Sequence, residues 1–207
     1  MSSRDLFVTG TDTNVGKTVL SATLCAALNR GYWKPIQTGI TEGSDSEAVQ
    51  RYADIPQTFP ESYRFDPPVS PHLAAQMAGA RIDLRGIQRP DTASRLVIEG
   101  AGGVMVPLNE RELMIDLMKM LEAPIVIAAR TALGTINHSL MTIEALRNAS
   151  LSVVGIVLIG EKNENNRRAI EHYGAVPVVG WLPLLPGINR AALIAAFDAH
   201  FDRKAFE

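Results

Sequence analysis

Short apolar runs alternate with longer segments of helical length along the whole chain. The apolar runs have the length of buried strands, and they lie at 6–8, 32–36, 95–99, 125–128, 153–159 and 178–182. The intervening segments are predicted to be helices, at 17–30, 44–52, 72–77, 112–122, 135–148, 165–173 and 188–201. This alternation predicts an α/β fold, with a mostly parallel sheet and helices on both faces. Since no linker, repeat or low-complexity tract interrupts it, we expect one domain over residues 1–207.

Local signals refine the region that follows the second apolar run. Pro35 indicates that this strand ends there or lies near a sheet edge, and residues 37–39 are expected to form a turn. Ser44, with Glu47 three residues later, is a capping-box pattern that predicts a helix start. Residues 54–71 are rich in proline and aromatic residues and are expected to be irregular. Irregular loops of this length are often functional, although a surface excursion without a role is an equally open alternative.

A glycine-rich loop follows the first predicted strand and opens the first predicted helix. Its sequence is Gly10-Thr-Asp-Thr-Asn-Val-Gly-Lys-Thr18, with five residues between the glycines where the usual phosphate-binding loop has four. Backbone N–H groups in such a loop converge on one point, where the helix dipole also favours negative charge. Lys17 would reach the terminal phosphates of a nucleoside triphosphate, and the Thr18 hydroxyl would hold Mg²⁺. The strand before and the helix after favour a phosphate site over a chance Gly-Lys-Thr string.

Further charged residues fall near the carboxyl ends of predicted strands, where parallel sheets bind ligands. Glu99 ends a buried strand, and burial there favours a metal or cation partner over a solvated acid. Lys34 would join Lys17 at one phosphate site, with one cation on the nucleotide and one on the acceptor, unless it is a surface lysine. Asp45 would either supply a second oxygen ligand to Mg²⁺ or only interact with the dipole of its helix.

Composition excludes several classes of function. The 20 Lys and Arg residues against 22 Asp and Glu residues leave no basic field for nucleic acid or an anionic membrane. No apolar run approaches the ~20 residues of a membrane span, and the N-terminus leaves no room for a signal peptide. The single cysteine, Cys25, excludes an internal disulfide and fits a reducing compartment. We therefore expect a cytoplasmic protein that acts on small molecules.

The order and spacing of these stretches resemble dethiobiotin synthetase. Besides the loop, the similarity covers Trp33-Lys-Pro-Ile-Gln-Thr-Gly39, Ser44-Asp-Ser46, Ser70-Pro-His72, Glu99-Gly-Ala-Gly-Gly103 and Leu133-Gly-Thr-Ile-Asn-His138. The longer loop is itself a family feature. The resemblance implies a homodimeric, ATP- and Mg²⁺-dependent ligase of biotin biosynthesis that carboxylates 7,8-diaminononanoate with CO₂ and closes a cyclic urea. ATP would phosphorylate the carbamate to a carbamic–phosphoric anhydride, which the neighbouring amine attacks.

The resemblance also implies roles for individual residues. The catalytic residues would be Lys34 and Lys17, and the Mg²⁺ ligands would be Thr18, Asp45 and Glu99. Nucleotide contacts would come from Asn14, Val15, Gly16, Lys17, Thr18, Val19, Asp45, Glu99, Gly100, Ala101, Gly102 and Pro183. Substrate contacts would come from Thr11, Lys34, Thr38, Leu133 and Asn137, the last two near a dimer interface.

One stretch departs from the family pattern in the expected base pocket. Members that favour ATP often have Asn after the fifth strand, where this chain has Ile159 and Gly160. The proline after the sixth strand persists as Pro183, but the acid expected a few residues later is absent. Because an aliphatic side chain cannot pair with adenine, we predict weak base selection, so that CTP or GTP would serve nearly as well as ATP.

Two other functions were weighed against this one. Amidating synthetases of the cobyrinic acid type usually append a glutaminase domain, for which 207 residues leave no space. Partition-type or switch ATPases have a second lysine inside the phosphate loop, and residues 11–15 contain none. A P-loop switch ATPase that acts by binding partners remains the alternative function.

Overall fold

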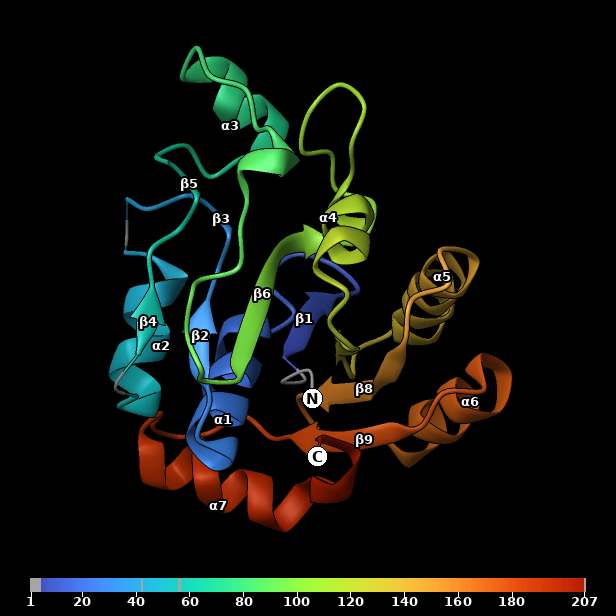
Figure 1. Ribbon diagram of the computed structural model, residues 1–207. Helices are drawn as coiled ribbons and strands as arrows, with labels where there is room; N and C mark the ends of the chain where they lie inside the picture. The colour runs from blue at the N-terminus through green and yellow to red at the C-terminus, as the bar shows by residue number, and fades with distance from the viewer. Residues whose placement is uncertain (1–4, 42, 56, 207) are drawn as a thin grey trace.

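The structure is a computed structural model that describes residues 5–41, 43–55 and 57–206. Its centre is a seven-stranded sheet in the order β4-β2-β6-β1-β7-β8-β9, and the described neighbouring strands are all parallel (Figure 1). The strands are β1 (Leu6–Gly10), β2 (Gly31–Trp33), β4 (Thr58–Phe59), β6 (Leu96–Gly103), β7 (Ile125–Arg130), β8 (Val153–Ile159) and β9 (Val178–Leu182). The expected α/β fold with a mostly parallel sheet is confirmed.

Helices cover both faces of this sheet. They are α1 (Lys17–Leu28), α2 (Asp45–Ala53), α3 (Pro71–Met77), α4 (Met114–Leu121), α5 (Thr135–Asn148), α6 (Glu164–Gly174) and α7 (Arg190–His200). Successive side chains of β1 point to opposite faces. Val8 packs in the apolar layer of α1, α2 and α7, whereas Phe7 packs in the layer of α4, α5 and α6. Two short 3₁₀ helices, Leu84–Gly86 and Arg203–Phe206, complete the helical elements among the described residues.

The region around Pro35 agrees with the sequence prediction only in part. β2 ends at Trp33, just before Pro35, as expected, and it lies beside the edge strand β4, between β4 and β6. The chain leaves the central sheet there and forms β3 (Ile36–Thr38), where a turn was expected. β3 pairs in parallel with β5 (Tyr63–Phe65), and α3 packs beside this second sheet. Residues 54–71 are therefore not wholly irregular, because they include β4 and β5.

The ends of the helices and strands can be compared with the capping and glycine signals in the sequence. The capping box at the start of α2 is confirmed, since Ser44 and Glu47 exchange both hydrogen bonds. Helix α1 ends at Asn29 in the left-handed conformation (φ 52°), two residues before Gly31. Strand β6 continues past Glu99 through the glycines to Gly103. A Cβ on Gly100 would lie 2.9 Å from Phe7 Cε1, so glycine is needed for this close packing.

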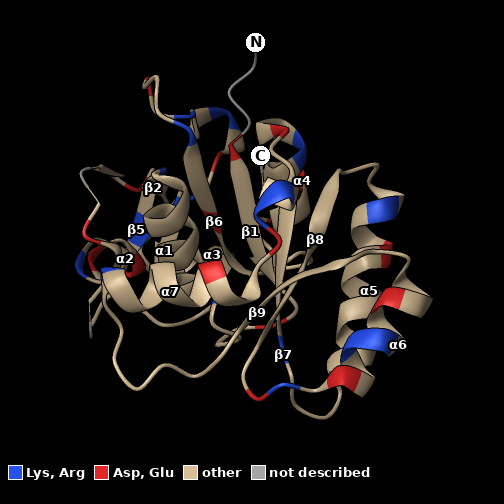
Figure 2. Cartoon of the chain, turned by 90° about the horizontal axis from the view of Figure 1, so that it is seen from below, with Lys and Arg blue, Asp and Glu red and all other residues tan. Residues whose placement is uncertain are grey.

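The surface shows mixed charge. Figure 2 shows acidic and basic residues together on α5 and α6, where Arg147 pairs with Glu144 and Arg167 with Glu164. Such pairs are exposed and contribute little to stability. Within the described residues, no helix is long and apolar enough to cross a bilayer.

A partly buried ion pair between Asp5 and Arg89 holds the loop that leads into β6. Arg89 binds both carboxylate oxygens of Asp5, at 2.6 and 3.1 Å, and Asp5 also accepts the backbone N–H of Leu96. The same guanidinium donates to the backbone carbonyls of Pro90, Thr92 and Ser94. Arg89→Met would leave the Asp5 carboxylate without its charge partner. We expect it to lower the free energy of unfolding by about 3 kcal/mol, measured by urea denaturation.

Arg81→Met is the matched control for this variant. Arg81 pairs with Glu110 at 3.0 Å, but both side chains are more than half exposed. Its loss should change the free energy of unfolding by no more than about 0.5 kcal/mol. An equally small change in the free energy of unfolding for Arg89→Met would contradict the proposal that Arg89 stabilises the loop before β6.

Candidate active site

The phosphate loop joins β1 to α1 at the carboxyl edge of the sheet. Asn14 and Gly16 both have positive φ, at 55° and 99°, which curls the loop backbone around one point. The start of α1 has no side-chain cap among the described residues, so its first N–H groups remain available to an anion. Lys17 Nζ donates to the Asp12 carbonyl at 3.0 Å. A Cβ on Gly10 would lie 3.0 Å from that nitrogen, so glycine there leaves room for the lysine.

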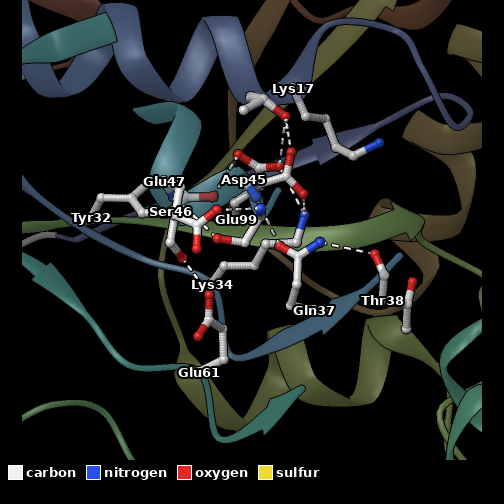
Figure 3. Close-up of polar contacts among 12 residues, drawn as sticks. Lys17, Tyr32, Lys34, Gln37, Thr38, Asp45, Ser46, Glu47, Glu61 and Glu99 are labelled. Carbon is white, nitrogen blue, oxygen red and sulfur yellow. Dashed lines mark hydrogen bonds and ion pairs between the residues drawn. The ribbon is translucent and has the colours of Figure 1, made fainter. Parts of the chain in front are cut away.

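Four polar side chains from four different segments converge beside this loop. Thr18 comes from α1. Lys34 follows β2, Asp45 begins α2, and Glu99 lies within β6 (Figure 3). Lys34 Nζ lies 2.6 Å from Asp45 Oδ2 and 3.0 Å from Glu99 Oε1. The Thr18 hydroxyl donates to Asp45 and lies 3.4 Å from Glu99 Oε1. The structure thus brings together the residues that the sequence analysis proposed for metal and phosphate chemistry, and none of them is a free surface group.

Burial and charge act against each other in this cluster. Burial disfavours the charged form of Lys34, but the two carboxylates outweigh it, and the pKa of Lys34 is raised above its ordinary value. Burial also disfavours ionised Asp45, yet Lys34 and the hydrogen bonds from Thr18 and Gln37 hold its pKa below the ordinary value. For Lys17, burial prevails over the nearby carboxylates of Glu99, Asp45 and Asp12, and its pKa is lowered. A phosphate group bound at the loop would favour its charged form.

Two residues of the site were missed by the sequence analysis. The Tyr32 hydroxyl lies 3.1 Å from Glu99 Oε2, and Gln37 Oε1 accepts the backbone N–H of Asp45 at 3.1 Å. Both side chains are buried. The available signal was spacing: in a strand, Tyr32 shares a face with Lys34 two residues on.

A pocket of about 420 Å³ lies on the other side of the phosphate loop. Its lining includes Asn14, Val15, Gly16, Val19, Ile159, Gly160, Leu182, Pro183, Leu184 and Ile188. These residues come from the loop, α1, and the ends of β8 and β9. Four of the expected nucleotide residues, Asn14, Val15, Gly16 and Val19, thus line one pocket with Pro183, whereas Lys17 and Thr18 do not line it. No described residue of 54–71 lines this pocket.

The remaining predicted residues are more dispersed. Thr11 bonds through its backbone N–H to Ala128 at the end of β7, and Thr38 ends β3. Gly100 to Gly102 lie in β6, beside the first glycine of the loop. Leu133 and Asn137 are exposed, and the described contacts do not connect them to the Lys34 cluster within one chain.

Comparison with known proteins agrees with a nucleotide-binding site at this place. The chain matches the sequence profile of an AAA domain family over residues 4–192. It is 50% identical over 190 residues to the ATP-dependent dethiobiotin synthetase BioD of Paramagnetospirillum magneticum, covering 92% of this chain and 93% of the relative. It is 47% identical to the protein of the same name from Brucella ovis, covering 97% and 95%. For the Rhodopseudomonas palustris protein the identity is 44%, covering 99% and 97%.

Solved structures show the fold. A ParA family ATPase from Chlorobium tepidum superposes with a TM-score of 0.57 at 10% identity, covering 95% of this chain and 92% of its own. The cell division ATPase MinD of Pyrococcus furiosus gives a TM-score of 0.51 at 16% identity, covering 94% and 89%. At such identities the likeness extends to a P-loop NTPase fold and no further. The sequence relatives decide the family: the chain belongs to the ATP-dependent dethiobiotin synthetases.

Proposed function

We propose that this protein forms dethiobiotin from 7,8-diaminononanoate and CO₂, with hydrolysis of ATP to ADP and phosphate, in biotin biosynthesis. The observation that supports this most directly is the position of Lys34, held at 2.6 and 3.0 Å between two carboxylates beside the phosphate loop. A second cation at that place suits an anionic acceptor that faces the terminal phosphate. The shared name of the relatives supplies the substrate class.

The reaction would proceed in three steps. One amine of the substrate adds to CO₂ and loses a proton, giving a carbamate. A carbamate oxygen then attacks the γ-phosphorus of ATP, the bond to ADP breaks, and a carbamic–phosphoric anhydride forms. The second amine attacks the carbonyl carbon, phosphate leaves, and loss of a proton completes the cyclic urea. In this scheme Lys17 neutralises the terminal phosphates, and Lys34 orients the carbamate and the phosphoryl group in transfer.

The donor set fits a magnesium ion. Thr18, Asp45 and Glu99 offer one hydroxyl and two carboxylates, and no cluster of three or more His, Cys, Asp or Glu residues occurs in the described part of the chain. Mg²⁺ typically keeps several waters and takes one or two carboxylates together with phosphate oxygens. When bound, it would offset the charge that develops on the phosphate oxygens.

The diamine acid would bind at the α5 end of the site, between two copies of the chain. Leu133 is fully exposed and Met141 on α5 is 64% exposed, so an apolar strip lies beside Asn137. Exposed apolar side chains that cluster in this way mark interaction surfaces. We propose a homodimer through this strip, with Thr11, Thr38, Leu133 and Asn137 near the substrate. We also place the enzyme in the cytoplasm, where its buried Cys25 stays reduced.

The similarity to solved structures of ParA family and cell division ATPases does not support the alternative function of a switch ATPase. Their likeness is one of fold, at 10 and 16% identity. The clustering of Lys34, Asp45 and Glu99 suits a second, anionic substrate.

The test measures nucleoside diphosphate release with Mg²⁺-ATP and bicarbonate, in the presence and absence of 7,8-diaminononanoate. We expect the diamine to raise release at least about tenfold, a barrier change of about 1.4 kcal/mol, with dethiobiotin detected by mass spectrometry. Omitting bicarbonate should abolish the product. Release that ignores the diamine would contradict the ligase function and favour the switch ATPase.

A further inference from the structure

The hydroxyl of Tyr32 belongs to the Lys34 cluster, but the proposed chemistry gives it no role. Tyr32 lies on β2, fully buried in the apolar layer of α1, α2 and α7. A buried tyrosine hydroxyl needs a hydrogen-bond partner. Its partner here is Glu99 Oε2, at 3.1 Å (Figure 3).

The two oxygens of Glu99 have different environments. Oε2 accepts the Tyr32 hydroxyl, whereas Oε1 faces Lys34 at 3.0 Å and Thr18 at 3.4 Å. Rotation of a carboxylate about its last bond is otherwise soft, so packing alone does not fix the plane in which its two oxygens lie. The tyrosine hydrogen bond removes that freedom and directs Oε1 towards the other donors.

Strand register explains why Tyr32 is placed to do this. β2 and β6 are parallel, with Tyr32 opposite Val97 and Trp33 opposite Ile98. Residues two apart share a face of the sheet, so Lys34 and Glu99 lie on the face of Tyr32, one step further along. The tyrosine therefore reaches Oε2 of the carboxylate, while the lysine, one step further along the face, reaches Oε1.

We infer that Tyr32 is a positioning residue that presents Glu99 to the metal through a single oxygen, Oε1. This inference rests on the proposed function, because the metal role of Glu99 belongs to it. Partners that orient a metal ligand typically contribute 10–100-fold to metal affinity or activity. Tyr32→Phe keeps the ring and removes only the hydroxyl, so the change isolates the hydrogen bond.

The experiment is a titration of Mn²⁺ into the protein saturated with ADP, followed by electron paramagnetic resonance, with no turnover involved. We expect Tyr32→Phe to weaken Mn²⁺ binding at least about tenfold. The control is Tyr63→Phe, which also removes a hydroxyl with hydrogen bonds, to Asp83, away from the cluster. It should bind Mn²⁺ like the wild type.

A double-mutant cycle separates positioning from general damage to the fold. If Tyr32 acts through Glu99, Tyr32→Phe in a Glu99→Gln background should cause no further loss of Mn²⁺ affinity. An equal further loss in that background, or wild-type affinity in the single variant, would overturn the inference. Failure of the proposed function would be seen in the turnover assay instead. In that case the wild-type protein would hydrolyse nucleotide independently of the diamine, while Tyr32→Phe would still weaken Mn²⁺ binding.

Discussion

Replacing Lys34 by methionine is expected to reduce diamine-dependent turnover about a thousandfold and to tighten, not weaken, the binding of a divalent cation. The loss follows from removing the cation that would stabilise the charge of the phosphoryl group in transfer. The gain in cation affinity follows from the contacts of Lys34. Lys34 Nζ bridges Asp45 and Glu99, and these are the carboxylates that a metal would need. Methionine fills a similar volume without charge, so the two carboxylates would attract Mn²⁺ more strongly, by about tenfold or more.

Two measurements check this expectation independently. Steady-state assays give kcat with all substrates saturating, and Mn²⁺ titration of the ligand-free protein gives the cation affinity. Lys119→Met is the control, because Lys119 pairs with Asp116 on the exposed surface of α4. It should leave both quantities unchanged. Turnover within about tenfold of the wild type would remove Lys34 from the chemistry, and unchanged Mn²⁺ affinity would contradict its competition with the metal.

Much of the central fold could be predicted because its elements are long enough to show a pattern. Strands such as β8, with seven residues, and helices such as α5, with fourteen, contain several repeats of their period. The strands β3, β4 and β5 were missed because two or three residues contain no period. Their placement depends on pairing between residues more than twenty apart in the sequence, of β3 with β5 and of β4 with β2.

Some residues of the site could be predicted from the sequence, and others could not. Lys34, Asp45 and Glu99 could be proposed because each charged residue lies at or near the end of a predicted strand or helix, where burial is costly without a partner. Tyr32 could not, because a tyrosine in an apolar run is typical of the core. That Lys34 contacts both carboxylates depends on side-chain directions from three segments. The approach of Leu133 and Asn137 to the substrate would require a second chain, which no local pattern describes.

The catalytic efficiencies, kcat/KM, for ATP, CTP and GTP are expected to agree within about tenfold, or about 1.4 kcal/mol. The pocket beside the phosphate loop is mostly apolar at the expected place of the base, chiefly through Ile159, Leu182 and Leu184, and its polar lining residues are Asn14, Arg130 and Thr131. Two of its backbone carbonyls are already engaged. The Gly160 carbonyl accepts Trp181 Nε1 at 2.7 Å, and the Ile159 carbonyl accepts the N–H of Thr131 at 3.2 Å.

Apolar contact can hold any base but distinguishes poorly among them, whereas a site built to pair with a polar edge rejects a mismatched ligand strongly. Ile159→Asn should therefore raise the ratio of kcat/KM for ATP over CTP at least about tenfold, because it adds an amide to the pocket. Ile159→Leu is the matched control, as it retains the volume without the amide and should leave the ratio unchanged. Ile159 also packs on the loop, with Cδ1 only 3.0 Å from where a Cβ on Gly16 would lie, so KM values for all three nucleotides must be compared. A wild-type preference for ATP of about a hundredfold, or about 2.7 kcal/mol, would show that the base is recognised by groups other than these side chains.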